Sequence, residues 1–182
     1  VLACLQKIEK TGPCMAKRIK TLVRSVFKYA IPTGRVQFDP TYGIESAMKK
    51  HKSGHYASIS VDELPQFLLD LFEYRARLSR QTFLAIYLML LTFVRTSELI
   101  GAKWEEINFD KAMWVIPAER MKMRLPHMVP LSKQALKILD ELKDMNGRRE
   151  YVFPSLPRRK KPMSNGTILM ALKRMGYKHK MS

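Results

Sequence analysis

The feature that most constrains the fold is an apolar run from Phe83 to Val94, interrupted by Thr92 alone. Arg80 and Arg95 bound the run, so a charged side chain stands at each end of it. A helix needs about 20 consecutive apolar residues to cross a bilayer, and this run is shorter. We therefore expect a helix from about Arg80 to Val94 that is buried in the core of a folded domain, and no membrane-spanning segment.

Apolar residues at helical spacing predict further helices on both sides of this core helix. Residues 15–30 carry such a pattern, and Ser60 with Glu63 has the spacing of a capping box before the next helix. Ser132 and Ser164 stand directly before two later amphipathic segments, where they are expected to cap the helices. Most of the chain is therefore predicted to be helical.

Two short segments in the second half are typical of strands. Residues 112–117 (AMWVIP) and 127–131 (HMVPL) are apolar and short, and residues 121–125 between them have the composition of a turn. They predict an antiparallel hairpin. The expected fold class is mainly α with a small antiparallel β-hairpin or sheet, that is, an α+β fold.

A division into two parts is expected near residue 55. Residues 47–57 (AMKKHKSGHYA) contain few apolar side chains and include Gly54, which is typical of a linker. The predicted parts are residues 1–55, a small helical part, and residues 56–182, which contain the core helix and the hairpin.

The charge of the chain is strongly positive and unevenly distributed. The net charge is +17; residues 1–57 carry 11 basic against 3 acidic side chains, residues 58–147 carry 12 against 12, and residues 148–182 carry 10 against 1. A balanced body between two basic margins predicts a polyanionic partner. Charge alone fits a DNA-binding protein and a basic RNA-binding or ribosomal protein equally well.

The helix expected over residues 15–30 is basic on the faces that are not apolar. Cations of one sign on a helix repel one another unless an anion binds, so we expect these side chains to face DNA. A solvated face is the alternative interpretation. The residues concerned are Lys17, Arg18, Lys20, Arg24 and Lys28.

Cysteine content and the first residues favour a cytoplasmic protein. Cys4 and Cys14 have no histidine partners at a metal-ligand spacing, so no zinc site is predicted, and two cysteines are not a disulfide framework. No apolar leader segment follows Val1. We expect a reducing compartment, and neither a metal nor a cofactor.

The segment directly after the core helix contains a charged pair. Arg95 follows the apolar run at once, and Glu98 lies three residues further on, where a helix would bring the two side chains together. A charge at this place is costly without a partner. By itself the pair could be purely structural.

The order of the following elements resembles the tyrosine recombinases, or phage integrases, of satellite phages and genomic islands. In that family an R-x-x-E-L motif supplies the first catalytic residue, which here is Arg95, with Glu98 and Leu99 completing the motif. The family's catalytic lysine lies on the hairpin, seven residues before the valine of a V-P-L-S strand; here these are Lys122 and Val129. The resemblance covers nearly the whole chain.

The resemblance implies cleavage of a phosphodiester by a tyrosine through a covalent phosphotyrosine. A guanidinium such as that of Arg95 can hold the non-bridging oxygens with two hydrogen bonds. A lysine on a mobile hairpin, here Lys122, can protonate the leaving 5′-oxygen as a general acid. Glu98 would support Arg95. Lys122 has an alternative interpretation as one of several cations that contact phosphates.

Further basic side chains of residues 56–182 are expected to contact the DNA backbone. They lie near the hairpin turn and in the basic loop of residues 155–162. His127 is as compatible with a strand edge as with a DNA contact and is given no chemical role. The expected DNA contacts are Arg120, Arg124, Arg158, Arg159 and Lys160.

The 182 residues lack some of the family's catalytic groups. The family continues with an H-x-x-R motif, a further His or Trp, and the tyrosine nucleophile; His179 has Ser182 at the position where that motif has its arginine, and Tyr177 precedes the motif. We therefore expect a fragment that is inactive by itself.

The resemblance implies a recombinase that integrates or excises mobile DNA. Its partner would be double-stranded DNA at attachment sites, where the family assembles as a homo-tetramer, in the bacterial cytoplasm at the nucleoid. The alternatives are a non-catalytic basic DNA-binding module, in which Arg95 is structural, and a general RNA-binding protein.

Overall fold

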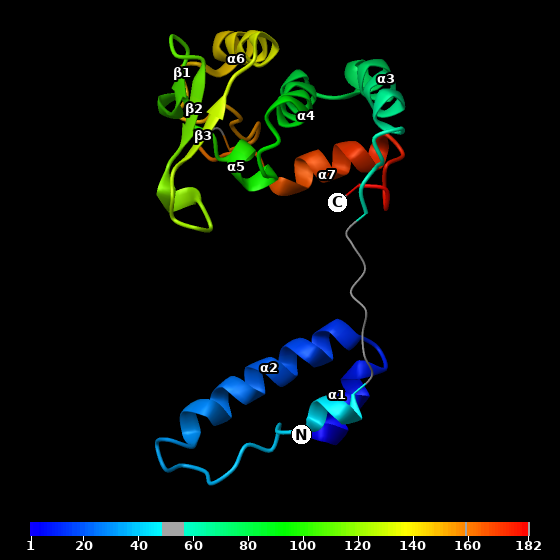
Figure 1. Cartoon of the computed structure of the whole chain (residues 1–182). Helices are drawn as coiled ribbons and strands as arrows, with labels where there is room; N and C mark the ends of the chain where they lie inside the picture. The colour runs from blue at the N-terminus through cyan, green and yellow to red at the C-terminus, as the bar shows by residue number, and fades with distance from the viewer. Residues whose placement is uncertain (49–56, 159, 182) are drawn as a thin grey trace. The chain divides into compact units, whose positions relative to one another are not determined.

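The chain divides into two compact units, Val1–His55 and Tyr56–Ser182 (Figure 1). This computed structural model describes residues 1–48, 57–158 and 160–181. Residues 49–56 of the predicted linker lie outside these ranges. No helix within the described ranges is both long and apolar enough to cross a membrane.

The first unit is a pair of packed helices followed by a short 3-10 turn. Helix α1 spans Leu2–Glu9, and α2 spans Pro13–Ala30, with its proline in the first turn, where a missing N–H costs nothing. The 3-10 helix η1 spans Ile44–Ala47. Leu5 and Ala16 are buried at this small core.

The predicted apolar stripe of α2 is only partly covered. Ile19, Val23 and Phe27 are half-buried, but Leu22 is 66% exposed and Val26 is 59% exposed. The apolar spacing predicted over residues 15–30 is present in α2, but part of this apolar side is exposed to solvent. The physical reason is that α1 is less than half as long as α2 and covers only part of its surface.

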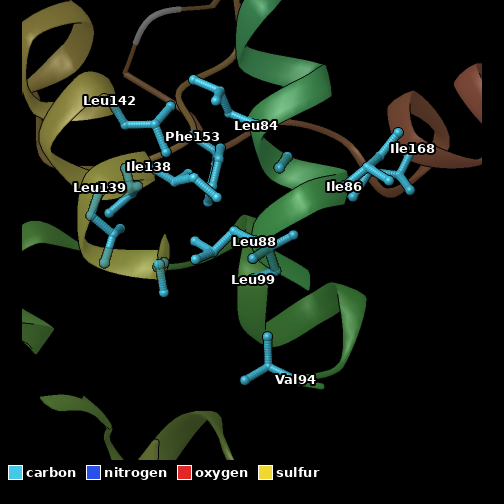
Figure 2. Packing of buried hydrophobic residues seen from close by; sticks show 14 of the residues in the cluster. Leu84, Ile86, Leu88, Val94, Leu99, Ile138, Leu139, Leu142, Phe153 and Ile168 are labelled. Atoms are coloured by element: carbon cyan, nitrogen blue, oxygen red, sulfur yellow. The ribbon is translucent and has the colours of Figure 1, made fainter. Parts of the chain in front are cut away.

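The second unit is organised around α4, which spans Arg80–Thr92 and contacts both α6 (Lys133–Asn146) and α7 (Asn165–Arg174). Figure 2 shows apolar side chains of α6 on one side of α4 and Ile168 of α7 on the other. Helix α3 spans Leu64–Tyr74 and α5 spans Thr96–Ile100. The predicted buried core helix is confirmed. The fully buried residues of the surrounding core include Leu84, Ile86 and Leu88 of α4, Leu99 of α5, Leu139 and Leu142 of α6, and Phe153.

The core helix ends two residues earlier than its apolar run. Thr92 is the last helical residue, and Phe93 adopts the left-handed conformation with φ 53° while its side chain is 91% exposed. After this left-handed residue Val94 packs into the core, where it is 5% exposed. The expected end at Val94 was therefore wrong, and this turn sets the direction in which Arg95 leaves the core.

The predicted serine caps have different outcomes. Ser60 and Glu63 form both bonds of the capping box, 2.8 Å from the Ser60 N–H to the carboxylate and 3.3 Å from the Glu63 N–H to the hydroxyl, although regular helix begins only at Leu64. Ser132 accepts the Ala135 N–H. Ser164 was expected to cap α7 in the same way, but its hydroxyl instead lies 3.2 Å from the hydroxyl of Thr167.

The predicted hairpin is confirmed and belongs to a three-stranded antiparallel sheet. Strand β2 spans Met113–Ile116 and pairs with β3, His127–Pro130, with Trp114 opposite Val129. A two-residue strand, β1 (Ile107–Asn108), pairs with the other edge of β2. This strand was not predicted because two residues are too few to show an alternating pattern.

The segment after α7 is fastened to α3 by Tyr177. Its hydroxyl donates to the carboxylate of Asp70 at 2.6 Å, and its ring meets Phe67 edge-on with 4.9 Å between centroids. Burial, together with the hydrogen bond to Asp70, raises the pKa of Tyr177 to about 12. Tyr177 therefore stays protonated as a hydrogen-bond donor at neutral pH. That it is not the nucleophile stays a prediction.

Tyr177→Phe should lower the free energy of unfolding by about 1–2 kcal/mol at pH 7, because a hydrogen bond to a charged acceptor is lost. The folded pKa lies above the unfolded value of about 10, so this stabilisation is complete below pH 10 and is lost as the pH rises towards 12. Urea denaturation between pH 7 and 11.5 measures both effects. Tyr74→Phe is the control, and an equal cost at pH 11.5 and pH 7 would contradict this account.

Candidate functional site

Arg95 stands at the start of α5, directly after the left-handed turn at Phe93. Its backbone is extended (φ −69°, ψ 151°), and its carbonyl accepts the Leu99 N–H at 2.9 Å, so it is the N-cap residue of the helix. Its side chain is 68% exposed. The arginine predicted to be the first catalytic residue is therefore open to a ligand while its backbone is fixed by the helix start.

Glu98 holds Arg95 at two points. One carboxylate oxygen accepts the Arg95 N–H at 2.9 Å, and the other accepts Nη1 of the guanidinium at 2.7 Å. The Glu98 side chain is only 5% exposed. Burial acts to raise the pKa of Glu98, but the hydrogen bonds from Arg95 and its positive charge outweigh it, so the pKa lies below its ordinary value. Glu98 is thus a charged anchor for an exposed cation.

Lys122 lies in the turn between β2 and β3. It follows the 3-10 helix η4 (Ala118–Arg120) by two residues, and its side chain is exposed. Arg124, also exposed, adopts a left-handed conformation with φ 52° in the same turn. Among the hydrogen bonds and ion pairs of the described ranges, none joins Lys122 directly to Arg95.

Arg120 makes the connection between the hairpin and α5. Its guanidinium donates from Nη1 to the carboxylate of Glu106 and from Nη2 to the main-chain carbonyl of Glu98. The other oxygen of Glu106 accepts Nε1 of Trp114 at 3.0 Å. The Arg120 side chain is 21% exposed. Its expected role as a DNA contact stays a prediction, but the group is turned into the domain.

Sequence reasoning missed Glu106 and Trp114 as parts of this site. Glu106, in the 3-10 helix η3 (Trp104–Glu106), is 8% exposed, and Trp114 is fully buried. The signal was slight, because Glu105 and Glu106 are adjacent acids and only the fold shows which one turns inwards. His127, at the start of β3, is exposed and near enough to lower the pKa of Glu98.

The basic face predicted on α2 is partly neutralised. Lys20 Nζ lies 2.6 Å from the carboxylate of Glu45, and Arg24 Nη1 lies 3.1 Å from the same oxygen. The hydrogen bond from Lys20, together with these charges, lowers the pKa of Glu45. Lys17, Arg18 and Lys28 are exposed. These three remain the better candidates for phosphate contacts.

The basic loop of residues 155–162 carries three of the predicted DNA contacts. Arg158 and Lys160 are exposed, whereas Arg159 lies outside the described residues. Within the described ranges, His, Cys, Asp and Glu side chains form no group of three or more that could hold a metal ion.

Comparison with known proteins assigns the chain to a family. The model described as "Phage integrase family" matches residues 58–182, and the one described as "Phage integrase central domain" matches residues 1–47. The chain belongs to the phage integrase family. Relatives include an integrase of Enterobacteria phage P4, 37% identical over 190 residues, and the prophage integrase IntZ of Escherichia coli (strain K12), 41% identical over 178 residues. These alignments cover 97% and 98% of this chain, but only 43% of either relative.

Solved structures show the same fold. One is a lambda integrase dimer bound to a COC' core site; the superposition covers 96% of this chain and 49% of the lambda integrase chain, with a TM-score of 0.72 and 24% identity. A Tn1549 transposon integrase in complex with a circular intermediate DNA matches 100% of this chain and 65% of that chain, with a TM-score of 0.77 and 12% identity. The expected α+β fold of the tyrosine recombinases is confirmed.

Glu98→Gln should destabilise the second unit by about 1–3 kcal/mol at pH 7, because the charged acceptor of two Arg95 donors is lost. The folded pKa of Glu98 is below its unfolded value of about 4.3, so the stabilisation is present above that pH and is lost as the pH falls through the folded pKa. Urea denaturation at pH 7 and pH 3 should show the cost of the substitution shrinking at pH 3. Glu119→Gln, at an exposed position, should cost little at both, and a pH-independent cost for Glu98→Gln would contradict the assignment.

Proposed function

We propose that this chain is part of a site-specific DNA recombinase that cuts and rejoins DNA through a covalent phosphotyrosine. The observation that carries the proposal is the Arg95–Glu98 pair: an exposed guanidinium is held by an almost fully buried carboxylate at the start of α5. The guanidinium is 68% exposed while the carboxylate fixes its base, so it is open to an anion such as a phosphate. Membership of the phage integrase family supports the same conclusion.

Arg95 and Lys122 would divide the chemistry at the scissile phosphate. The guanidinium would bind non-bridging oxygens and stabilise the charge that builds up there. Lys122, exposed in the hairpin turn, would donate a proton to the leaving 5′-oxygen. The nucleophile would be a tyrosine of the kind that the family carries after its H-x-x-R motif, a motif that these 182 residues do not contain.

The two units would bind DNA together. Residues 1–55 would serve as the core-binding part and residues 56–182 as the catalytic part. The partner would be double-stranded DNA at attachment sites, on which the complete protein would act as a homo-tetramer during integration or excision of mobile DNA. The place of action would be the bacterial cytoplasm, at the nucleoid. The alternative, a non-catalytic basic DNA-binding module, makes Arg95 structural.

Cleavage is tested with a suicide substrate. The protein used is one in which this chain is followed by a segment with the H-x-x-R motif and the tyrosine nucleophile, and it is called the complete protein below. Arg95→Ala should abolish the DNA adduct that survives denaturation, and Lys122→Ala should slow its formation by about 10²-fold or more, because a general acid is lost. Arg95→Lys should also abolish the adduct but spare DNA binding, since the charge stays while the planar fork is lost.

The 182-residue chain by itself should bind DNA without forming an adduct. In the adduct assay, Lys137→Ala, at an exposed position of α6, is the control for the loss of one positive charge and should form the adduct at the unsubstituted rate. Salt-sensitive DNA binding by the complete protein without an adduct on any substrate would favour the non-catalytic module and remove both catalytic assignments.

DNA binding by the first unit is tested by the salt dependence of affinity. Each lost phosphate contact should reduce the slope of log K against log salt by about 0.9. Lys17→Gln and Lys28→Gln should each show such a reduction. Lys20→Gln is the matched control, because the Lys20 cation is paired with Glu45 and should release fewer counterions. Equal slopes for all three variants and the unsubstituted chain would exclude this face of α2 as a DNA contact.

A further inference from the structure

One half-buried cation, Arg120, joins the segments that carry Arg95 and Lys122. Arg120 ends η4 and stands two residues before Lys122, and it donates to the carbonyl of Glu98 inside α5. Its other donor is bound by Glu106, whose second oxygen holds Trp114 of β2. The base of the hairpin turn is thereby tied to the helix that presents the Arg95–Glu98 pair.

Gly101 packs closely against the guanidinium of Arg120 and limits where it can lie. Gly101 follows α5 with φ −85°, a conformation that any residue can adopt, so its lack of a side chain is not required by the backbone. A Cβ atom at this position would lie 2.9 Å from Nη2 of Arg120 and 3.3 Å from its Cζ. The glycine therefore leaves room for the Arg120 side chain and for nothing more.

We propose that Arg120, held by Glu106, is a positioning residue that sets the place of Arg95 relative to Lys122, and is not a contact to DNA. This inference rests on the proposed recombinase function. The planar fork of an arginine can satisfy a carboxylate and a carbonyl at once, whereas the single ammonium of a lysine cannot hold both in fixed directions. Replacing Arg120 therefore frees α5 from the hairpin even where the charge is kept.

Its accessibility separates Arg120 from the other cations of the hairpin. The Arg120 side chain is 21% exposed and has two protein acceptors, whereas Arg124 is exposed in the turn itself. If the Nη1 donor of Arg120 turned from Glu106 to a phosphate, Glu106, which is 8% exposed, would lose its cation while still accepting Trp114 Nε1. That cost is large compared with the gain from one phosphate contact.

The first test measures cleavage rate and DNA affinity in the complete protein. Arg120→Lys and Gly101→Ala should each lower the rate constant of adduct formation by about 10²-fold, the loss expected for a misplacement on the order of 1 Å. DNA affinity and its salt slope should stay unchanged. Arg124→Gln should do the reverse, reducing the slope by about 0.9. A slope reduced by the same amount in Arg120→Gln, or full cleavage by Arg120→Lys, would overturn the proposal.

The second test uses amide hydrogen exchange of the 182-residue chain and does not depend on DNA. The Arg95 amide, bonded to Glu98, should exchange at least about ten times faster in Arg120→Lys and Gly101→Ala, because opening of α5 is a local event. The exchange rates of the α4 amides are the internal control and should not change in either variant. Arg124→Gln is the control variant, and its Arg95 amide should exchange at the unsubstituted rate. Unchanged protection of Arg95, or an equal loss over the whole unit, would overturn the positioning role. If no DNA adduct forms in any version, the proposed function fails and this measurement still decides the inference.

Discussion

The double hydrogen bond from Arg95 to Glu98 is the interaction on which the candidate site depends. A buried carboxylate is costly unless its charge is compensated, and here one oxygen binds the backbone and the other binds the guanidinium of the same residue. The acid therefore stays ionised inside the domain, while the cation that compensates it remains open to solvent. Rigidity and accessibility, which usually oppose each other for a long side chain, are combined at one position.

The core of the second unit supplies the fixed frame for this pair. Helix α4 is packed between α6 and α7, and after the left-handed turn at Phe93 Val94 is buried and Arg95 begins α5. Phe93 itself is 91% exposed, so the turn is made at the expense of one large apolar side chain in solvent. Arg120 then couples the frame to the hairpin through Glu98 and Glu106.

Much of this fold could be predicted because the signals are local. The apolar run, the capping pattern of Ser60 with Glu63 and the two apolar strands each depend on a few neighbouring residues, and all three elements are present. The R-x-x-E pattern also predicted the contact between Arg95 and Glu98 correctly, although Arg95 is the extended N-cap residue of α5 and Glu98, at N3, reaches back to it as in a capping box.

What could not be predicted depends on contacts between distant segments. Nothing near Arg120 in the sequence distinguishes it from Arg124, since both are basic residues beside a turn; the difference is Glu106, 14 positions away. In the same way Glu45 neutralises Lys20 across 25 positions, and the short α1 leaves Leu22 uncovered. Charge patterns along the chain show which residues are cations, but only the fold shows which cations are already occupied.

A crystal structure of the complete protein on DNA with an intact scissile phosphate tests the central claim most directly. The account predicts the Arg95 guanidinium within about 3 Å of non-bridging phosphate oxygens, the distance of a charge-assisted hydrogen bond, with its bonds to Glu98 retained. Arg120 should remain on Glu106 and the Glu98 carbonyl, without a DNA contact. Arg95 turned away from the phosphate, or Arg120 bound to the DNA backbone, would contradict it.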